Sequence, residues 1–72
     1  MQKWEYCFVT ADTEKDQWRA RHVNDRELSD WKKGPTMSQY ANQLGEEGWE
    51  LVCSTFSGGM GYYKYVFKRA KA

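Results

Sequence analysis

The chain has 72 residues, with 11 basic and 10 acidic side chains and a formal net charge of +1. This length suits one small domain over residues 1–72 with a single modest core. The balanced charge gives no field to attract nucleic acid or an anionic membrane, and no apolar run approaches the roughly 18 residues of a membrane span. The composition thus argues against a polybasic binder and against a membrane protein.

The two cysteines, Cys7 and Cys53, lie in apolar segments of strand-like composition. No Cys-x-x-Cys or Cys/His ligand spacing occurs, so we expect no structural metal and no cofactor. The first residues lack the charged and then apolar stretch of a secretory signal, which predicts a cytoplasmic location where thiols stay reduced. We therefore expect two buried free thiols.

Aromatic residues make up 17% of the chain, with four Trp, five Tyr and three Phe. One small core cannot enclose so many rings, so part of the aromatic surface should meet another subunit or a ligand. Such cores rarely supply more than about 3–5 kcal/mol, and small domains often gain the rest from a disulfide, a metal or a partner subunit. With the first two disfavoured, the sequence predicts a homo-oligomer, a dimer or larger.

Four segments have the composition of strands, at residues 3–11, 17–23, 49–57 and 62–69. A polar turn at 12–16 separates the first two, and the glycine-rich turn after Ser57 joins the last two as a hairpin. Between the pairs, residues 26–35 are expected to form an irregular or short helical excursion that ends at Gly34-Pro35.

A helix is predicted after Thr36. The residues Thr36 and Gln39 have the spacing of a capping box, in which each side chain satisfies a backbone amide of the helix start. An apolar stripe follows at Met37, Tyr40, Ala41 and Leu44. Gly48 can supply the left-handed residue that ends the helix. Together the segments predict an α+β domain, in which one helix packs on one face of a four-stranded antiparallel sheet.

The alternation of residues predicts which side chains face the helix. In the first segment Trp4, Tyr6 and Phe8 share one face, and Glu5, Cys7 and Val9 share the other. We expect Trp49, Leu51 and Cys53 to face the helix, together with Tyr63, Tyr65 and Phe67. The opposite face would then carry an oligomer interface formed by Cys7, Val9, Val52 and Val66, beside Arg19 and Arg21.

Three blocks carry a resemblance to a known family: Trp4-Glu5-Tyr6, the run LGEEGWELV from Leu44 to Val52, and Phe67-Lys68-Arg69. With these blocks the sequence resembles domain-of-unknown-function family 4177, whose members are short bacterial and phage proteins. The resemblance implies the element order ββαββ. It brings no assigned activity.

Catalysis is not expected, because the chain lacks an evident nucleophile with a base or a carboxylate pair. His22 is the only histidine and is interpreted as a half-buried strand residue. The favoured function is a non-catalytic oligomeric module that binds another protein. Its exposed anchors would be Leu28 and Trp31, with the alternative that these two residues form a lid over one end of the core.

A second hypothesis is sequestration of a nucleotide-like signalling molecule in a pocket between subunits, as in phage anti-defence proteins. Such a pocket needs aromatic planes, basic side chains and turn amides. The candidate residues are Trp18, Arg19, Arg21, Tyr62, Lys64, Ser57, Gly58 and Gly59. A third hypothesis is binding of single-stranded nucleic acid on the sheet aromatics, which the balanced charge disfavours.

Overall fold

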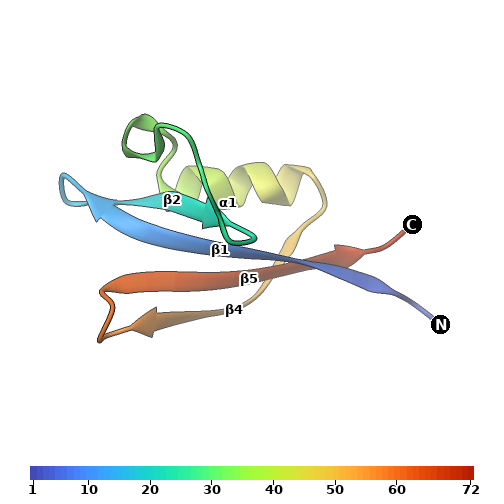
Figure 1. Cartoon of the computed structure of the whole chain (residues 1–72). Coiled ribbons are helices and arrows are strands. Elements are labelled where there is room, and N and C mark those ends of the chain that lie inside the picture. Colours follow the sequence, from blue (N-terminus) through green and yellow to red (C-terminus); the bar gives the residue numbers. More distant parts are fainter.

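The computed structural model describes all 72 residues of the chain. One antiparallel sheet of five strands carries one α-helix on one of its faces (Figure 1), and the strands lie in the order β3-β2-β1-β5-β4. The elements in chain order are β1 (Trp4–Glu14), β2 (Gln17–Val23), β3 (Arg26–Glu27), the 3-10 helix η1 (Trp31–Lys33), α1 (Met37–Glu46), β4 (Glu50–Ser57) and β5 (Tyr62–Ala70). Neither helix is long and apolar enough to cross a membrane.

The predicted α+β class, with one α-helix on an antiparallel sheet, is confirmed. The sheet has five strands and not four, because part of the segment expected to be irregular pairs with β2 as the two-residue strand β3. The rest of that segment contains the short helix η1.

Two tight turns without glycine join the first three strands. Lys15 and Asp16 have φ values of 54° and 65° between β1 and β2, and Asn24 and Asp25 have 50° and 69° between β2 and β3. Positive φ at both central residues is the geometry of a type I′ turn, which matches the twist of a hairpin. The first turn is thus shorter than predicted, and β1 extends further to meet it.

Helix α1 begins and ends as predicted. Thr36 Oγ1 accepts from Gln39 N at 3.2 Å, and Gln39 Oε1 accepts from Thr36 N at 3.0 Å, so both halves of the capping box form. At the other end Gly48 has a φ of 91°, and Trp49 N donates to Leu44 O at 3.0 Å. The left-handed glycine and this bond close the last turn as in a Schellman motif.

The core lies between α1 and the middle of the sheet. Its buried side chains are Cys7, Val9, Ala11, Ala20, Met37, Leu44 and Phe67. Three of them on β1 and β2, Val9, Ala11 and Ala20, are 0% exposed. Small side chains at these positions let the helix approach the sheet closely without leaving voids. Tyr63, Tyr65 and Phe67 of β5 face the helix as predicted and belong to this centre or pack against it.

The prediction for the two faces of β1 was wrong. Cys7 is 4% exposed and Val9 is 0% exposed. Both face α1 within one subunit, so neither lies at an oligomer interface. The larger side chains Trp4, Tyr6 and Phe8 face away from the helix and are exposed. The physical reason is packing: the helix rests on small residues, and three rings beneath it would hold it away from the sheet.

An irregularity in β4 changes the alternation of its side chains. Leu51 pairs with Phe67, whereas Cys53 pairs with Val66, so the register shifts between them. A bulge adds one residue to a strand, and the residues beyond it exchange faces. Leu51 therefore lies on the helix side and Cys53 on the other side, exposed to solvent. The prediction that Cys53 faces the helix and is buried was wrong.

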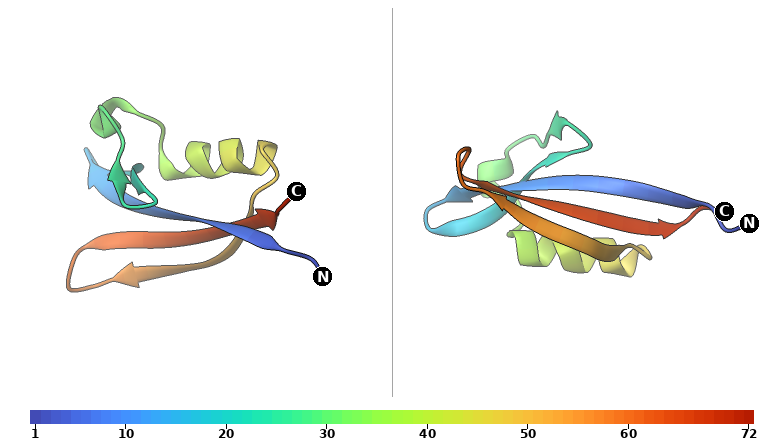
Figure 2. Two further views of the ribbon diagram at one scale, coloured as in Figure 1. Left: turned by 45° about the vertical axis from the view of Figure 1, so that its right-hand side comes forward. Right: turned by 90° about the horizontal axis from the view of Figure 1, so that it is seen from below.

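The two ends of the chain leave the sheet side by side, because β1 and β5 are antiparallel neighbours at its centre. Lys71 N donates to Lys3 O at 2.8 Å, just beyond the last residue of β5. Figure 2 shows both termini at the same end of the sheet, and it also shows that α1 lies on one side of the sheet only.

Candidate functional site: the helix-free face of the sheet

The face of the sheet opposite α1, here called the helix-free face, carries a row of aromatic side chains on β1. The row consists of Trp4, Tyr6 and Phe8, which are 44%, 50% and 49% exposed. Paired residues of neighbouring strands share a face, and Phe8 pairs with Val66 while Tyr6 pairs with Lys68. Large apolar side chains that stay half exposed on an uncovered sheet face indicate a binding surface.

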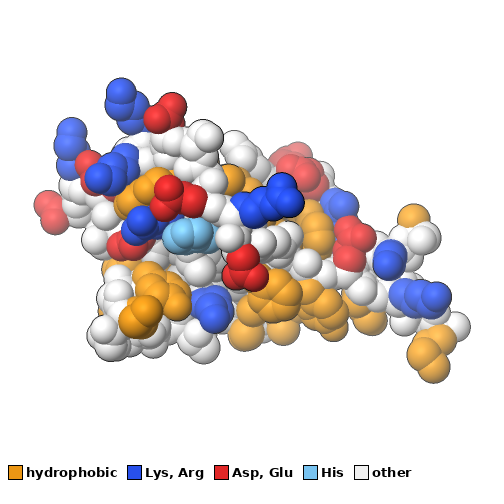
Figure 3. Space-filling model, viewed as in Figure 1, with side chains coloured by type: hydrophobic (Ala, Val, Ile, Leu, Met, Phe, Trp, Pro, Cys, Tyr) orange, Lys and Arg blue, Asp and Glu red, His pale blue; other side chains and the backbone are white.

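Further apolar side chains flank this aromatic row. Val66 lies on the helix-free face, as the alternation of residues predicted, and it is half-buried. Val52, at the bulge in β4, is 50% exposed, and Cys53 beyond it pairs with Val66 and is exposed on the helix-free face. Figure 3 shows hydrophobic side chains gathered along the lower margin of the sheet, beside a cluster of charged side chains around the histidine.

One basic residue partly covers the row. Lys68 Nζ lies 4.3 Å from the centre of the Trp4 ring and 3.8 Å from Glu50 Oε1. The first contact is a cation–π interaction and the second an exposed ion pair, each weak in water. The row is therefore edged by a paired positive and negative charge, and its centre at Tyr6 and Phe8 is uncharged.

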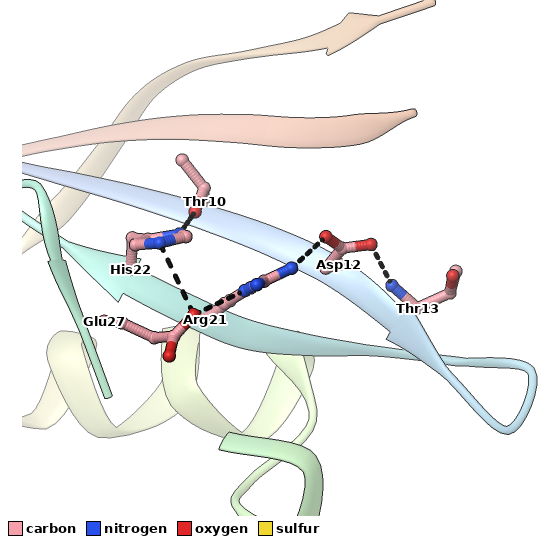
Figure 4. A network of polar contacts seen from close by, with 6 residues as sticks. All are labelled: Thr10, Asp12, Thr13, Arg21, His22 and Glu27. Carbon is pink, nitrogen blue, oxygen red and sulfur yellow. Dashed lines mark hydrogen bonds and ion pairs between the residues drawn. The ribbon is translucent and has the colours of Figure 1, made fainter. Parts of the chain in front are cut away.

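A polar network adjoins the aromatic row on the same sheet; it consists of Thr10, Asp12, Arg21, His22 and Glu27 (Figure 4). Arg21 Nη1 donates to Asp12 Oδ2 at 3.0 Å, and Arg21 Nε donates to Glu27 Oε2 at 2.9 Å. The hydrogen bond to Glu27, followed by that to Asp12, raises the pKa of the Arg21 guanidinium. Arg21 is thus held between two carboxylates.

A second bulge positions this network. Thr10 pairs with His22, but the next pair along the strands is Ala11 with Ala20, so Arg21 is the extra residue of β2. The bulge lets consecutive side chains, Arg21 and His22, both approach the helix-free side. Local sequence gives no sign of this bulge, and regular alternation placed the two residues on opposite faces.

The contact between Thr10 and His22 has the appearance of part of a catalytic triad. Thr10 Oγ1 lies 2.9 Å from His22 Nδ1, and His22 Nε2 lies 3.8 Å from Glu27 Oε2. The second distance is too long for a hydrogen bond, so no carboxylate orients the ring. Thr10 also lies in the middle of β1, paired on both sides, where strand pairing engages the backbone amides that would form an oxyanion hole. The geometry favours a network that orders charged side chains over a nucleophilic site.

A hollow of about 520 Å³ lies over the network, lined by Thr10, Asp12, Arg21, His22, Asp25, Met60 and Tyr62. A smaller hollow of about 260 Å³ adjoins it, lined by Phe8, Thr10, His22, Asp25 and Lys64. Of the eight candidate ligand residues, the structure thus brings together Arg21, Tyr62 and Lys64. Because Arg21 is already paired with two carboxylates, its positive charge is compensated and attracts a phosphate group less strongly.

The other candidate ligand residues lie elsewhere. Trp18 is on the helix side, with its ring 4.8 Å from that of Tyr63. Arg19 donates to Gly34 O and to Gln17 Oε1, and so ties β2 to the segment before α1. Ser57, Gly58 and Gly59 belong to the β4–β5 turn, in which Ser57 O accepts from Gly61 N at 2.7 Å. These residues do not form one site with Arg21.

The proposed anchors Leu28 and Trp31 do not project into solvent. Trp31 is 9% exposed, and the Arg21 guanidinium carbon lies 4.8 Å from the centre of its ring. Leu28 is half-buried and packs against the core. The prediction that Trp31 is an exposed anchor was wrong, because Trp31 is buried beside Arg21; of the two residues, Leu28 packs against the core as the alternative expected.

The aromatic row of Trp4, Tyr6 and Phe8 was visible in the sequence but was expected on the helix side of the sheet. One signal distinguishes the two faces of β1. After Phe8 the even positions become polar, whereas the odd positions stay small and apolar to Ala11. The face that stays apolar through the centre of the strand, from Cys7 to Ala11, is the buried face.

Protein-family models, curated proteins and solved structures were compared with the chain, and none of them matches it. The resemblance to domain-of-unknown-function family 4177 therefore stays a prediction. No group of three or more His, Cys, Asp or Glu side chains is placed to hold a metal ion.

Proposed function

We propose that the protein is a non-catalytic interaction module that self-associates through the helix-free face of its sheet. The observation that supports this proposal is the aromatic row of Trp4, Tyr6 and Phe8, half exposed on a face that no element of the chain covers. Only eight of 72 residues are buried, so the monomer has a small core and much to gain from further apolar burial.

The size of the row suits the centre of an interface. Aromatic side chains bury about 150–250 Å² each, so covering the exposed halves of three rings removes about 300 Å² from water. A stable interface buries about 800 Å² per partner, with a hydrophobic centre and a polar rim. The flanking residues Val52, Cys53 and Val66 extend the apolar centre, and Lys68 and Glu50 lie at the rim.

A second copy of the chain is the occupant that this surface fits. Two sheets pack face to face at about 10 Å with their strands nearly aligned, and the side chains of the two inner faces interdigitate. The charges at the rim have both signs, and the net charge of +1 produces little repulsion between copies. Self-association would bury the row without a foreign partner.

The test is the mass of the assembly in solution. We expect light scattering to give at least twice the mass of one chain. Phe8→Lys would place a charge in the centre of the interface and should lower that mass twofold, while circular dichroism shows an unchanged fold. Asn42→Lys, on the exposed side of α1, makes a matched charge change and should leave the mass unaltered. A monomeric wild-type protein would refute the proposal.

Single-stranded nucleic acid is a second candidate ligand, because Lys64 and Lys68 of β5 lie beside the aromatic row on the same face. Stacking of bases on such rings is worth about 1–3 kcal/mol per base. Asp25 and Glu50 on or near this surface weaken the case, since they repel phosphates. Fluorescence anisotropy with a labelled oligonucleotide separates the candidates: binding that weakens with salt and is lost in Phe8→Ala supports the second.

A further inference from the structure

The two edges of the sheet are unequal. At one edge β3 has only two residues, and in the segment that follows Leu28 packs against the core and Trp31 is buried. At the other edge β4 has eight residues, of which seven are exposed. An edge strand presents unpaired backbone N–H and C=O groups, and natural proteins usually shorten, cover or charge such edges. Here the edge at β3 is short, whereas most of the edge at β4 is unprotected.

The devices that protect edges are confined to the first part of β4. Glu50 supplies a charge, and the bulge follows between Leu51 and Cys53. From Cys53 to Ser57 the strand is regular and carries no charged residue and no proline. This five-residue run is therefore open to pairing with another extended strand.

We propose that β4 pairs antiparallel with β4 of a second copy across a two-fold axis at Thr55. In a sheet, two residues that lie directly opposite each other have their side chains on the same face. Only registers that pair helix-side residues with helix-side residues are therefore allowed. Thr55 is the centre of the regular run from Cys53 to Ser57. A dyad there pairs all five residues, and the two sheets of five strands join into one of ten.

The helix side of this junction carries Ser54 and Phe56, and each Ser54 lies directly opposite Phe56 of the second copy. Phe56 pairs with Tyr63 and is therefore on the helix side, and its ring is 52% exposed. It lies 4.8 Å from the Tyr63 ring and 6.2 Å from the Trp18 ring, centre to centre. With the dyad at Thr55, the Phe56 side chains of the two copies are diagonal neighbours at about 7–8 Å, within reach of aromatic rings. The two Phe56 rings would then connect the Trp18, Phe56 and Tyr63 rings of one copy with those of the other.

The helix-free side of the junction is polar and carries no conflicting charge at the axis. Thr55 lies opposite its own copy, and cross-strand Thr pairs are favourable. The nearest basic residue on this face is Lys64, which pairs with Thr55 on β5. Two Lys64 side chains would be separated by three strand spacings, about 14 Å, where salt screens their repulsion. A second copy of β4 is thus a self-complementary partner.

The edge contact uses none of the aromatic row, so it goes beyond the proposed function and is tested in its absence. In the Phe8→Lys background, edge pairing predicts a dimer by light scattering. Adding Thr55→Lys, or separately Thr55→Glu, places like charges directly opposite each other and should halve the mass. An equimolar mixture of the two double variants places opposite charges across the axis and should restore the dimer. Adding Gln43→Lys, on the exposed side of α1, should change nothing.

Several outcomes would overturn the edge pairing. They are a monomeric Phe8→Lys protein, a double variant that remains dimeric, and a mixture that does not recover. The failure of the proposed function has another signature, in which Phe8→Lys leaves the wild-type mass unchanged while Thr55→Lys still halves it. Hydrogen exchange gives an independent readout, since amides of residues 53–57 should exchange more slowly in the Phe8→Lys dimer than in the Phe8→Lys,Thr55→Lys monomer.

Discussion

Arg21 was interpreted from the sequence as a ligand-binding residue, but in the structure its side chain binds other parts of the same chain. Its guanidinium holds Asp12 of β1 and Glu27 of β3 and lies over the ring of Trp31 in η1. Basic side chains in strands were interpreted as ligand groups, but this one joins three elements of its own chain. The two carboxylates compensate the charge of the guanidinium, which lowers its attraction for a phosphate.

The two cysteines differ in burial because Cys7 lies on the central strand β1 and faces α1, whereas Cys53 lies on the edge strand β4. Cys7 is buried and Cys53 exposed. Burial raises the pKa of the Cys7 thiol, and burial also raises the pKa of the Tyr40 and Tyr65 hydroxyls. The folded chain therefore keeps protons at a pH where the unfolded chain releases them.

This difference predicts lower stability in alkaline solution. Because the folded state binds more protons there, the free energy of unfolding decreases as pH rises through the unfolded pKa of cysteine, about 8.5, and then that of tyrosine, about 10. Below pH 8 these groups should add no pH dependence. Thermal denaturation between pH 7 and pH 11 measures the effect, and Cys7→Ala should remove its first part. A melting temperature that rises over this range would contradict the argument.

At the scale of elements, the positions of four of the five strands and of α1 were largely predictable, and only the short strand β3 was missed. The span of β2, the capping box at Thr36 and the glycine after α1 follow from local sequence, because neighbouring residues determine them. The faces were less predictable. Two bulges, one in β2 and one in β4, change the alternation, and each depends on how a strand pairs with its neighbour. No local pattern records such pairing.

The cap of α1 gives a quantitative prediction for this element. Thr36→Ala removes the hydroxyl that accepts from Gln39 N, and the free energy of unfolding should fall by about 1 kcal/mol. Urea denaturation measures the change. Ser38→Ala, in the first turn and exposed, is the matched control and should alter stability by less than about 0.5 kcal/mol. Equal losses in the two variants would show that the capping box does not stabilise the helix.

At the scale of the whole molecule, the two proposed contacts combine into a closed assembly. The two-fold axis of the edge contact is perpendicular to the sheet. The two-fold axis of the face contact lies between the two stacked sheets and parallel to them. Where such axes meet at right angles, they generate a tetramer with dihedral symmetry. The chain would then form two stacked sheets with helices on both outer sides, and the aromatic row would be enclosed.

The assembly predicts a ladder of masses. Native mass spectrometry should give four chains for the wild type, two for Phe8→Lys, two for Thr55→Lys and one for the double variant, because each substitution removes one kind of contact. Masses that exceed four chains and grow with concentration would show that the axes do not meet and that the contacts build an open filament. A wild-type mass of two chains would mean that only one of the two contacts forms. The single variant that becomes a monomer would identify which one.

The hydrogen bond between Lys71 N and Lys3 O has a consequence for the connectivity of the chain. Since the two ends lie side by side, a short linker can join them without disturbing β1 or β5. New ends can then be opened at Gly58 and Gly59, which are exposed in the β4–β5 turn. Such a circular permutant would retain every strand pair while β4 and β5 became the two ends of the chain.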